Sequence, residues 1–250
     1  MIHTKPNPYL IPAFHEPIIN FNFSTPYGLK NIDVFENFLT NGDCDKLIKL
    51  FDDAPEKAPV SIQGLKDVMS GKGSDRTTMW SEELAKMLFD KLAITTFNPN
   101  LFTNQFSRTD AWQKVDSLEN YWSLEAISPL LRFMSYSENG EHYPHYDAGY
   151  IYPNSKIRTL KSFVIYLTTN DSGATRFIRD KQTNILQSER NNDDWSRAAN
   201  DNEINIKILP SKGTILIFDH RLCHDVAKFT PESEDEKRII IRGDLIYKLC

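Results

Sequence analysis

The spacing of apolar residues predicts two helices in the first half of the chain. The segment Thr40-Asn41-Gly42-Asp43 resembles a capping box, and we expect a helix over residues 43–52 after it. Its apolar positions follow the i, i+3, i+4, i+7 spacing of one helix face, at Cys44, Leu47, Ile48 and Phe51. A second helix is expected after Ser81, with one apolar stripe formed by Leu84, Met87, Leu88 and Leu92.

Short runs of β-branched and aromatic residues predict strands, mainly after residue 127. These runs are LLRFMSY, TLKSFVIYLTT, INIKIL, TILIFD and RIIIRGDLIY, with an earlier alternating run, IDVFENFL, starting at Ile32. Gly, Pro, Asn and Asp separate them, and no helices alternate with them as in a parallel sheet. We therefore expect an antiparallel sandwich or jelly roll in the second half. The segment MSGKGSDRTT, residues 69–78, is expected to be a loop.

Two segments fit neither pattern. Residues 1–30 carry five prolines among polar and aromatic residues, which indicates an extended arm. Residues 181–204 are polar and rich in Asn and Asp, which indicates an insertion loop with one helical turn near Trp195.

Composition narrows the possible functions. A chain of 250 residues with 40% hydrophobic and 25% charged residues is an ordinary globular protein of one large domain or two small ones. The formal net charge of −5 argues against nucleic acid or anionic lipid as a partner. Three widely spaced cysteines favour a reducing cytoplasm, and we expect no signal peptide and no membrane span. The oligomeric state is not predicted.

The pattern His145-Tyr146-Asp147 is the first candidate for chemistry. In an extended segment residues i and i+2 point to the same face, so His145 and Asp147 could bind one ion together. A third ligand would complete a facial site with open positions, the arrangement that suits non-haem Fe(II) oxygen chemistry. His224, just beyond the run TILIFD, is the leading candidate, and His220 competes with it.

Two arginines interrupt the apolar run RIIIRGDLIY. A basic side chain in an Ile-rich strand must either extend to the edge of the sheet or meet an anion, and Arg238 opens this run. Arg242 lies on the same face by parity, and for either arginine the alternative is a partner such as Asp244 or solvent.

Four motifs together carry a resemblance to a known family. FMSYSENGEHYPHYDAGY, RTLKSFVIYLTTNDSGATRF, LPSKGTILIFDHRLCHDV and EKRIIIRGDLIYK occur in order over about residues 131–248. They resemble the catalytic domain of the Fe(II)/2-oxoglutarate-dependent dioxygenases, in the prolyl 4-hydroxylase-like branch. The upstream segment NIDVFENFLTNGDCDKLIKLF resembles the lead-in of that branch.

The resemblance implies an α+β fold with a double-stranded β-helix (jelly-roll) core buttressed by N-terminal helices. Residues 1–250 would form one integrated domain, with a Pro-rich arm over 1–30, a helical support region over 31–126 and a jelly-roll catalytic core over 127–250. This sequence departs from the family pattern at Thr168, at Ser172-Gly173-Ala174 and in the segment PESEDEK before Arg238.

The resemblance also implies a catalytic and metal-binding set of His145, Asp147 and His224. Arg238 would pair with the distal carboxylate of 2-oxoglutarate, and Tyr136 and Tyr166 would contact this cosubstrate. The expected cofactors are Fe(II), 2-oxoglutarate and O₂, with ascorbate as an optional reductant. His142 and Asp219 are not expected to bind metal.

The implied activity is hydroxylation of a C–H bond with release of succinate and CO₂. The substrate would be an amino-acid-like small molecule or a prolyl or other residue of a peptide. Two alternatives stay open: a jelly-roll binding or regulatory module without turnover, and a metal-dependent cupin-type enzyme without an oxoacid cosubstrate. The candidate substrate-facing residues are Tyr150, Tyr152, Arg76 and Trp80.

Overall fold

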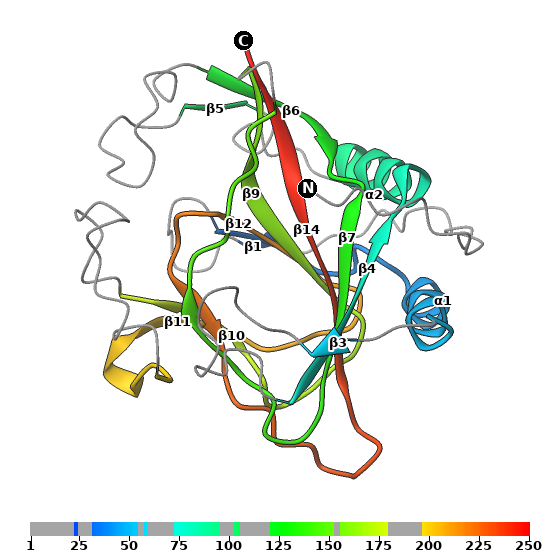
Figure 1. Cartoon of the computed structure of the whole chain (residues 1–250), viewed down its shortest axis with the longest axis vertical. Coiled ribbons are helices and arrows are strands. Elements are labelled where there is room, and N and C mark those ends of the chain that lie inside the picture. Colours follow the sequence, from blue (N-terminus) through cyan, green and yellow to red (C-terminus); the bar gives the residue numbers. More distant parts are fainter. Residues whose placement is uncertain are drawn as a thin grey trace.

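A computed structural model describes residues 23–24, 32–54, 58–59, 73–95, 103–105, 121–152, 156–179 and 197–250. Within these ranges the chain forms two α-helices and two antiparallel sheets (Figure 1). The arm predicted over 1–30, apart from one short strand, and most of the insertion predicted over 181–204, including Trp195, lie outside the described residues.

The two predicted helices are confirmed. Helix α1 spans Asn41–Asp52, and its capping box is closed because the Thr40 hydroxyl accepts from the Asp43 N–H at 3.1 Å while the Asp43 carboxylate accepts from the Thr40 N–H at 3.3 Å. Helix α2 spans Glu82–Thr95, and the hydroxyl of Ser81 accepts from the N–H of Leu84 at 3.1 Å.

The large sheet contains most of the strands. Its order is β1 (Phe23–Ser24), β2 (Ile32–Phe35), β12 (Ile215–Asp219), β9 (Ile157–Tyr166), β14 (Arg238–Leu249), β7 (Leu130–Tyr136), β4 (Ser74–Trp80) and β3 (Ala58–Pro59). Beside this path, β6 (Tyr121–Ile127) pairs with the far end of β14 and with β5 (Thr103–Gln105). Strand β14 is thus bonded to β6, β7 and β9.

The small sheet has the order β11 (Ile204–Ile208), β10 (Thr175–Ile178), β13 (His224–Val226) and β8 (His142–His145). A 3₁₀ turn over Asp201–Glu203 leads into β11. Two facing antiparallel sheets with this connectivity make a double-stranded β-helix, so the predicted α+β jelly roll is confirmed.

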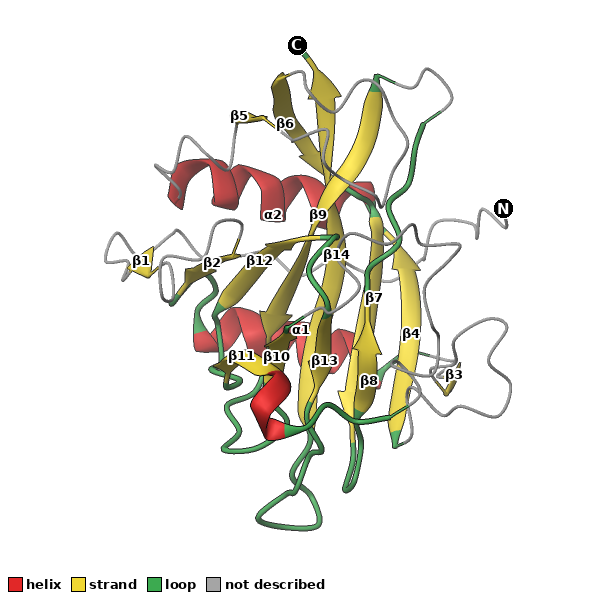
Figure 2. Ribbon diagram, turned by 90° about the vertical axis from the view of Figure 1, so that its left-hand side faces the viewer, coloured by secondary structure: helices red, strands yellow, loops and turns green. Residues whose placement is uncertain are grey.

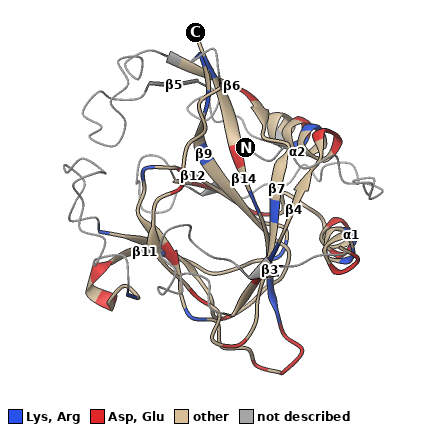
Figure 3. Cartoon of the chain, viewed as in Figure 1, with Lys and Arg blue, Asp and Glu red and all other residues tan. Residues whose placement is uncertain are grey.

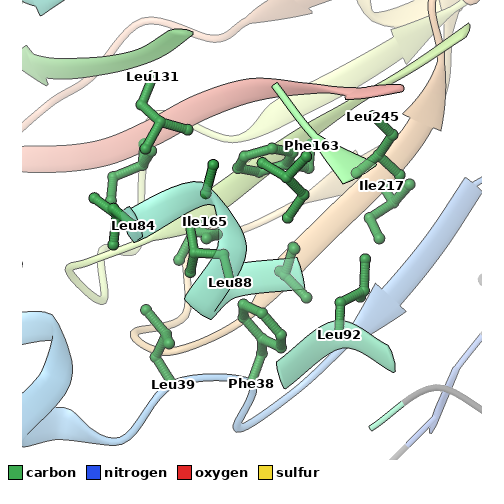
Figure 4. Close-up of a cluster of buried hydrophobic side chains, with 14 of the residues drawn as sticks. Phe38, Leu39, Leu84, Leu88, Leu92, Leu131, Phe163, Ile165, Ile217 and Leu245 are labelled. Carbon is green, nitrogen blue, oxygen red and sulfur yellow. The ribbon is translucent and has the colours of Figure 1, made fainter. Parts of the chain in front are cut away.

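The two faces of the large sheet have different roles. Both helices cover one face and the small sheet lies against the other (Figure 2). On the helix side, leucines of α2 pack on the sheet in the cluster of Figure 4, with Leu84, Leu88, Leu92, Leu131, Phe163, Ile165, Ile217 and Leu245. On the other side a second apolar cluster forms between the sheets, with Met134, Tyr136, Val164, Tyr166, Phe177, Phe218, Val226 and Ile240 among its members. Because side chains alternate along a strand, the helix side stabilises the fold while the inner side is available for a site.

Three expectations about the first half need correction. The loop predicted over 69–78 is wrong from Ser74 onward, because Ser74–Trp80 is strand β4, paired with β7. Its polar residues obscured the alternation: Ser74, Thr77 and Met79 are buried while Asp75 and Thr78 are exposed. The strand predicted from Ile32 ends at Phe35, because a turn follows it. The region 31–126 is also less helical than predicted, since β2, β4 and β6 belong to the large sheet.

Neither described helix is long and apolar enough to cross a lipid bilayer.

Candidate functional site

Two histidines face each other across the small sheet. His145 ends β8 and His224 begins β13, and the register pairs them directly. Their ring centroids lie 4.3 Å apart. Directly opposite residues of an antiparallel pair point to the same side, so the register alone brings the two imidazoles together.

Asp147 completes a compact group. It lies two residues after β8 and is buried. Its carboxylate oxygens are 3.9 Å from Nε2 of His145 and 3.8 Å from Nε2 of His224. One ligand atom from each of the three residues can be chosen so that all lie within 4.8 Å of one another.

Backbone contacts orient both imidazoles. Nδ1 of His145 lies 2.7 Å from the carbonyl oxygen of Tyr143, and Nδ1 of His224 lies 3.0 Å from that of Leu222. A neutral ring that donates from Nδ1 leaves its Nε2 lone pair free for a metal. Burial lowers the pKa of His145 to about 4 and also lowers that of His224, with positive neighbours adding to the effect, so both rings are neutral near pH 7.

A basic side chain holds Asp147 in its ionised form. The guanidinium of Arg242 contacts the Asp147 carboxylate at 2.5 Å, and the hydroxyl of Ser162 donates to the other oxygen. Burial alone would raise the pKa of Asp147, but Arg242, then His224 and His145, hold it well below its ordinary value. The carboxylate therefore keeps its charge at neutral pH.

This donor set fits a divalent iron ion. Two neutral imidazole nitrogens and one ionised carboxylate form the facial triad typical of non-haem Fe(II) sites, which leaves coordination positions for other ligands. The donors come from a strand pair and the residue group just after it, so the scaffold of the small sheet sets their spacing.

Arg238 is fully buried on the inner face of the large sheet, with 0% exposure. Its guanidinium lies over the rings of Tyr136, at 4.6 Å, and Tyr166, at 5.7 Å, and one nitrogen donates to the Thr175 hydroxyl at 3.3 Å. Nε and Nη1 have no hydrogen-bond partner among the described residues. A buried guanidinium is costly unless paired, so this position fits the carboxylate of a bound ligand.

A cavity of about 260 Å³ connects these groups. Its wall includes the three candidate ligands, Arg238 and Arg242. Apolar side chains of both sheets line the rest, among them Met134, Val164, Phe218, Val226 and Ile240. This combination of an apolar wall and a few converging polar groups is typical of small-molecule sites.

The other predicted residues divide into two groups. Tyr136, Tyr166 and Arg76 belong with the site: Tyr136 and Arg76 line the cavity, and Tyr166 donates its hydroxyl proton to Thr175 Oγ1 at 2.8 Å. Trp80 is not a wall residue; it lies four positions further along β4 than Arg76, opposite Leu130.

Tyr150 and Tyr152 also lie apart from the described cavity wall. Their rings pack edge to face with centroids 4.8 Å apart, and Tyr150 is 37% exposed. Their role as substrate-facing residues stays a prediction.

The structure also separates the two histidines that competed for the third position. His220 is not part of the close group of ligand atoms, and its Nε2 lies 3.4 Å from Asp244 Oδ1. Arg242 pairs with Asp244 at 3.6 Å, as expected, but its nearest carboxylate is that of Asp147, at 2.5 Å. The parity of β14 placed Arg242 on the cavity face, but only the packing of two sheets brings the loop after β8 against it.

The part of the chain that carries these residues matches a known family. The model of the 2OG-Fe(II) oxygenase superfamily matches residues 131–243. The part of the chain that carries the candidate site is thus similar to this superfamily. No curated protein sequence matches the chain.

Several solved structures are similar to this chain. OsALKBH1 has a TM-score of 0.54 with 13% identity, over 87% of this chain and 99% of that chain. HygX from Streptomyces hygroscopicus, with nickel and 2-oxoglutarate bound, has a TM-score of 0.52 with 12% identity, over 88% and 83%. The viral collagen prolyl hydroxylase vCPH from Paramecium Bursaria Chlorella virus-1 has a TM-score of 0.46 with 17% identity, over 88% and 97%.

Oxygenases of this superfamily use Fe(II), 2-oxoglutarate and O₂, and this chain is an enzyme of that class. The enzyme class and the expected Fe(II), 2-oxoglutarate and O₂ are thereby confirmed, while ascorbate stays a prediction.

Proposed function

We propose that this oxygenase hydroxylates a C–H bond of an amino-acid-like small molecule or of an amino-acid residue in a peptide. His145, Asp147 and His224 would hold the iron, and Arg238 would hold the distal carboxylate of 2-oxoglutarate. Bound iron would supply the redox chemistry that consumes 2-oxoglutarate and O₂, releases succinate and CO₂, and oxidises the C–H bond.

One observation carries this proposal. Three ligand atoms within 4.8 Å of one another line the same cavity as a buried guanidinium whose Nε and Nη1 are unpartnered among the described residues. A metal triad alone would suit many reactions, and a buried arginine alone would suit many anions. Together they match a cosubstrate that is both a chelator and a carboxylate.

The protein's own groups have separate tasks in this proposal. The neutral imidazoles present Nε2 lone pairs, and Arg242 with Ser162 fixes the orientation of the Asp147 carboxylate. The planar fork of Arg238 offers two parallel donors to a carboxylate, over aromatic rings that keep water out. The hydroxyls of Tyr136 and Tyr166 lie beside this fork, as candidates to contact the same carboxylate.

The test combines binding and turnover. Anaerobic addition of Fe(II) and 2-oxoglutarate should produce the visible charge-transfer absorption of an iron-bound 2-oxo acid, and admission of O₂ should produce succinate. Asp147→Ala should lose both signals, while circular dichroism shows that the fold survives. Asp53→Ala, which removes an exposed carboxylate at the end of α1, should retain both.

Two outcomes would contradict the proposal. If the wild-type protein binds no iron with 2-oxoglutarate, the chain is a jelly-roll module without turnover. If it binds iron and oxidises a substrate without consuming 2-oxoglutarate, the cupin-type reading holds instead.

A further inference from the structure

Arg76 is a cavity residue that the proposed chemistry leaves unused. It lies on β4 opposite Met134 of β7, and both residues line the cavity together with Asp147. The sequence indicates it as a substrate-facing candidate ahead of the second helix. In the structure it is a partly buried side chain on the wall of the site.

An inventory of charge shows what distinguishes Arg76. The cavity wall contains four arginines and a single carboxylate, that of Asp147. Arg242 is paired with Asp147 at 2.5 Å, and Arg132 with Asp244 at 3.1 Å. Arg132 is the one charged residue of β7, and Figure 3 shows a blue segment on this strand.

Arg76 has no carboxylate partner among the residues that the structure describes. Its nearest electrostatic influences are cationic: burial lowers its pKa, and Arg132 and Arg242 lower it further. Arg238 is assigned to the cosubstrate. One uncompensated positive charge therefore remains on the wall near the candidate metal ligands.

We propose that Arg76 binds a carboxylate of the primary substrate, and hence that the substrate is a small molecule with a free carboxylate. This inference rests on the proposed function and narrows it. In this proposal Arg76 binds the substrate directly. The neighbouring Arg132 stays paired with Asp244 and adds only to the positive electrostatic potential of the cavity.

The charge count favours a carboxylate over a phosphate. A phosphate monoester carries between one and a half and two negative charges at neutral pH, and sites for it commonly use two or more free cations. Arg76 supplies one free cation, which matches one carboxylate. An internal neutral residue of a peptide has no carboxylate at all, so a peptide substrate is an outcome of the test that opposes the proposal.

The experiment uses matched pairs of probes on the full chain. The free L-amino acids, their primary amides and a prolyl peptide blocked at both ends are tested for stimulation of succinate release. Each hit is then titrated anaerobically into the protein with Fe(II) and 2-oxoglutarate bound, which gives a dissociation constant without turnover. The variants are Arg76→Met, Arg76→Lys and, as a charge control, Lys86→Met, whose side chain is 73% exposed on α2.

We expect carboxylate probes to bind at least tenfold more tightly than their amides. Arg76→Met should weaken the carboxylate probe by roughly ten- to a hundredfold and leave its amide within about twofold, as expected for loss of a hydrogen bond between charged groups. Arg76→Lys should fall between, because it keeps the charge and loses the fork. Lys86→Met should bind both probes like the wild type.

Other results would overturn the inference. Equal binding of amides and acids, preference for the blocked peptide, absence of binding by every carboxylate probe, or an unchanged constant in Arg76→Met would each do so. Failure of the proposed function is distinct, because it removes the charge-transfer absorption of the wild type before any substrate is added. Loss of that absorption in Arg76→Met with its retention in Arg238→Met would assign Arg76 to 2-oxoglutarate and overturn both assignments.

Discussion

Of the two arginines on the inner face of β14, one has a carboxylate partner among the described residues and the other does not. Arg242 touches Asp147 at 2.5 Å, whereas Arg238 has two nitrogens without a described partner. Arg242 orients a candidate metal ligand, whereas Arg238 is available to bind an anion. The spacing of four residues in RIIIR showed that both face the same side, but not which one was already paired.

Replacement of Arg242 should weaken metal binding. Arg242→Met removes the cation that keeps Asp147 ionised and oriented, so we expect the dissociation constant for Fe(II) to rise by roughly ten- to a hundredfold. Anaerobic metal titration measures this, with Arg242→Lys as the variant that keeps the charge. A folded Arg242→Met protein with wild-type iron affinity would show that the contact does not position Asp147.

Replacement of Arg238 should have opposite effects on binding and stability. Arg238→Met removes a buried charge, so the affinity for 2-oxoglutarate should fall by roughly ten- to a hundredfold, while the metal-free protein gains about 1–3 kcal/mol in free energy of unfolding. Urea unfolding and 2-oxoglutarate titration measure the two quantities. A destabilised variant with normal cosubstrate binding would indicate a structural arginine.

At the scale of single residues, much of the site was predictable. The i, i+2 rule put His145 and Asp147 on one face, and the end of the run TILIFD pointed to His224. The choice between His220 and His224 needed the register of β13 against β8, which pairs His224 with His145. The pairing of Arg242 with Asp147 was not predictable, because it joins residues that only the sandwich brings together.

The turn before β10 is the element that makes room for Arg238. Gly173 has φ of +68°, and a Cβ at this position would lie 2.8 Å from Cδ of Arg238 and 3.2 Å from Phe229. The departure from the family pattern at Ser172-Gly173-Ala174 thus retains a glycine where the guanidinium stem passes.

A substitution in this turn should weaken 2-oxoglutarate binding as well as lower stability. Gly173→Ala should lower stability by about 1–2 kcal/mol through its left-handed backbone and should also weaken 2-oxoglutarate binding by displacing Arg238. Thermal unfolding and 2-oxoglutarate titration test both effects.

Gly213→Ala is the matched control for that turn. Gly213 has φ of +84°, and its added Cβ would meet the carbonyl oxygen of Leu39, away from Arg238. This variant should lose stability without losing cosubstrate affinity. Equal 2-oxoglutarate affinity in both variants would mean that the turn does not position Arg238.

Elements with a clear period were predictable and elements facing the cavity were less so. Both helices were found because their apolar stripes face a large core. Strand β4 is not predicted because residues such as Arg76 supply the polar groups of the cavity, so its inner positions are not apolar. The polar residues that line the site replace the apolar residues whose alternation normally identifies a strand in a sequence.

The whole molecule has a stability core and a site core on the two sides of one sheet. We propose that residues 1–250 form a single integrated domain, since β2, β4 and β6 of the first half pair with strands of the second half. The helix-side cluster anchors the sheet, and the inner cluster accommodates the buried charges of the site.

Acid should destabilise the metal-free protein. Burial lowers the pKa of His142, His145 and His224, so below pH 6.5 the unfolded chain binds protons that the folded chain does not. Asp219 opposes this, because burial raises its pKa to about 6 and the folded chain then binds a proton between pH 6 and pH 4. Burial also raises the pKa of Asp225, so two carboxyls oppose three imidazoles, and we expect a net loss of stability between pH 7 and pH 5.

Urea unfolding of chelator-treated protein at pH 7, 6 and 5 measures this loss. Asp219→Asn removes the opposing proton, so its stability should fall more steeply with acid than that of the wild type. A wild-type free energy of unfolding that stays level over this range would mean that the histidines are protonated in the folded protein.

Strand β14 lies in the middle of the large sheet and carries residues of the site, so the site can form only when this strand has paired. This strand separates β7 from β9 and carries Arg238 and Arg242, while its partner β7 begins more than one hundred residues earlier in the chain. Pairing over such a sequence separation is slow, because loop entropy is lost before contacts form. We therefore expect insertion of β14 to be late and rate-limiting, so refolding kinetics should show native tryptophan fluorescence and 2-oxoglutarate binding appearing in the same phase.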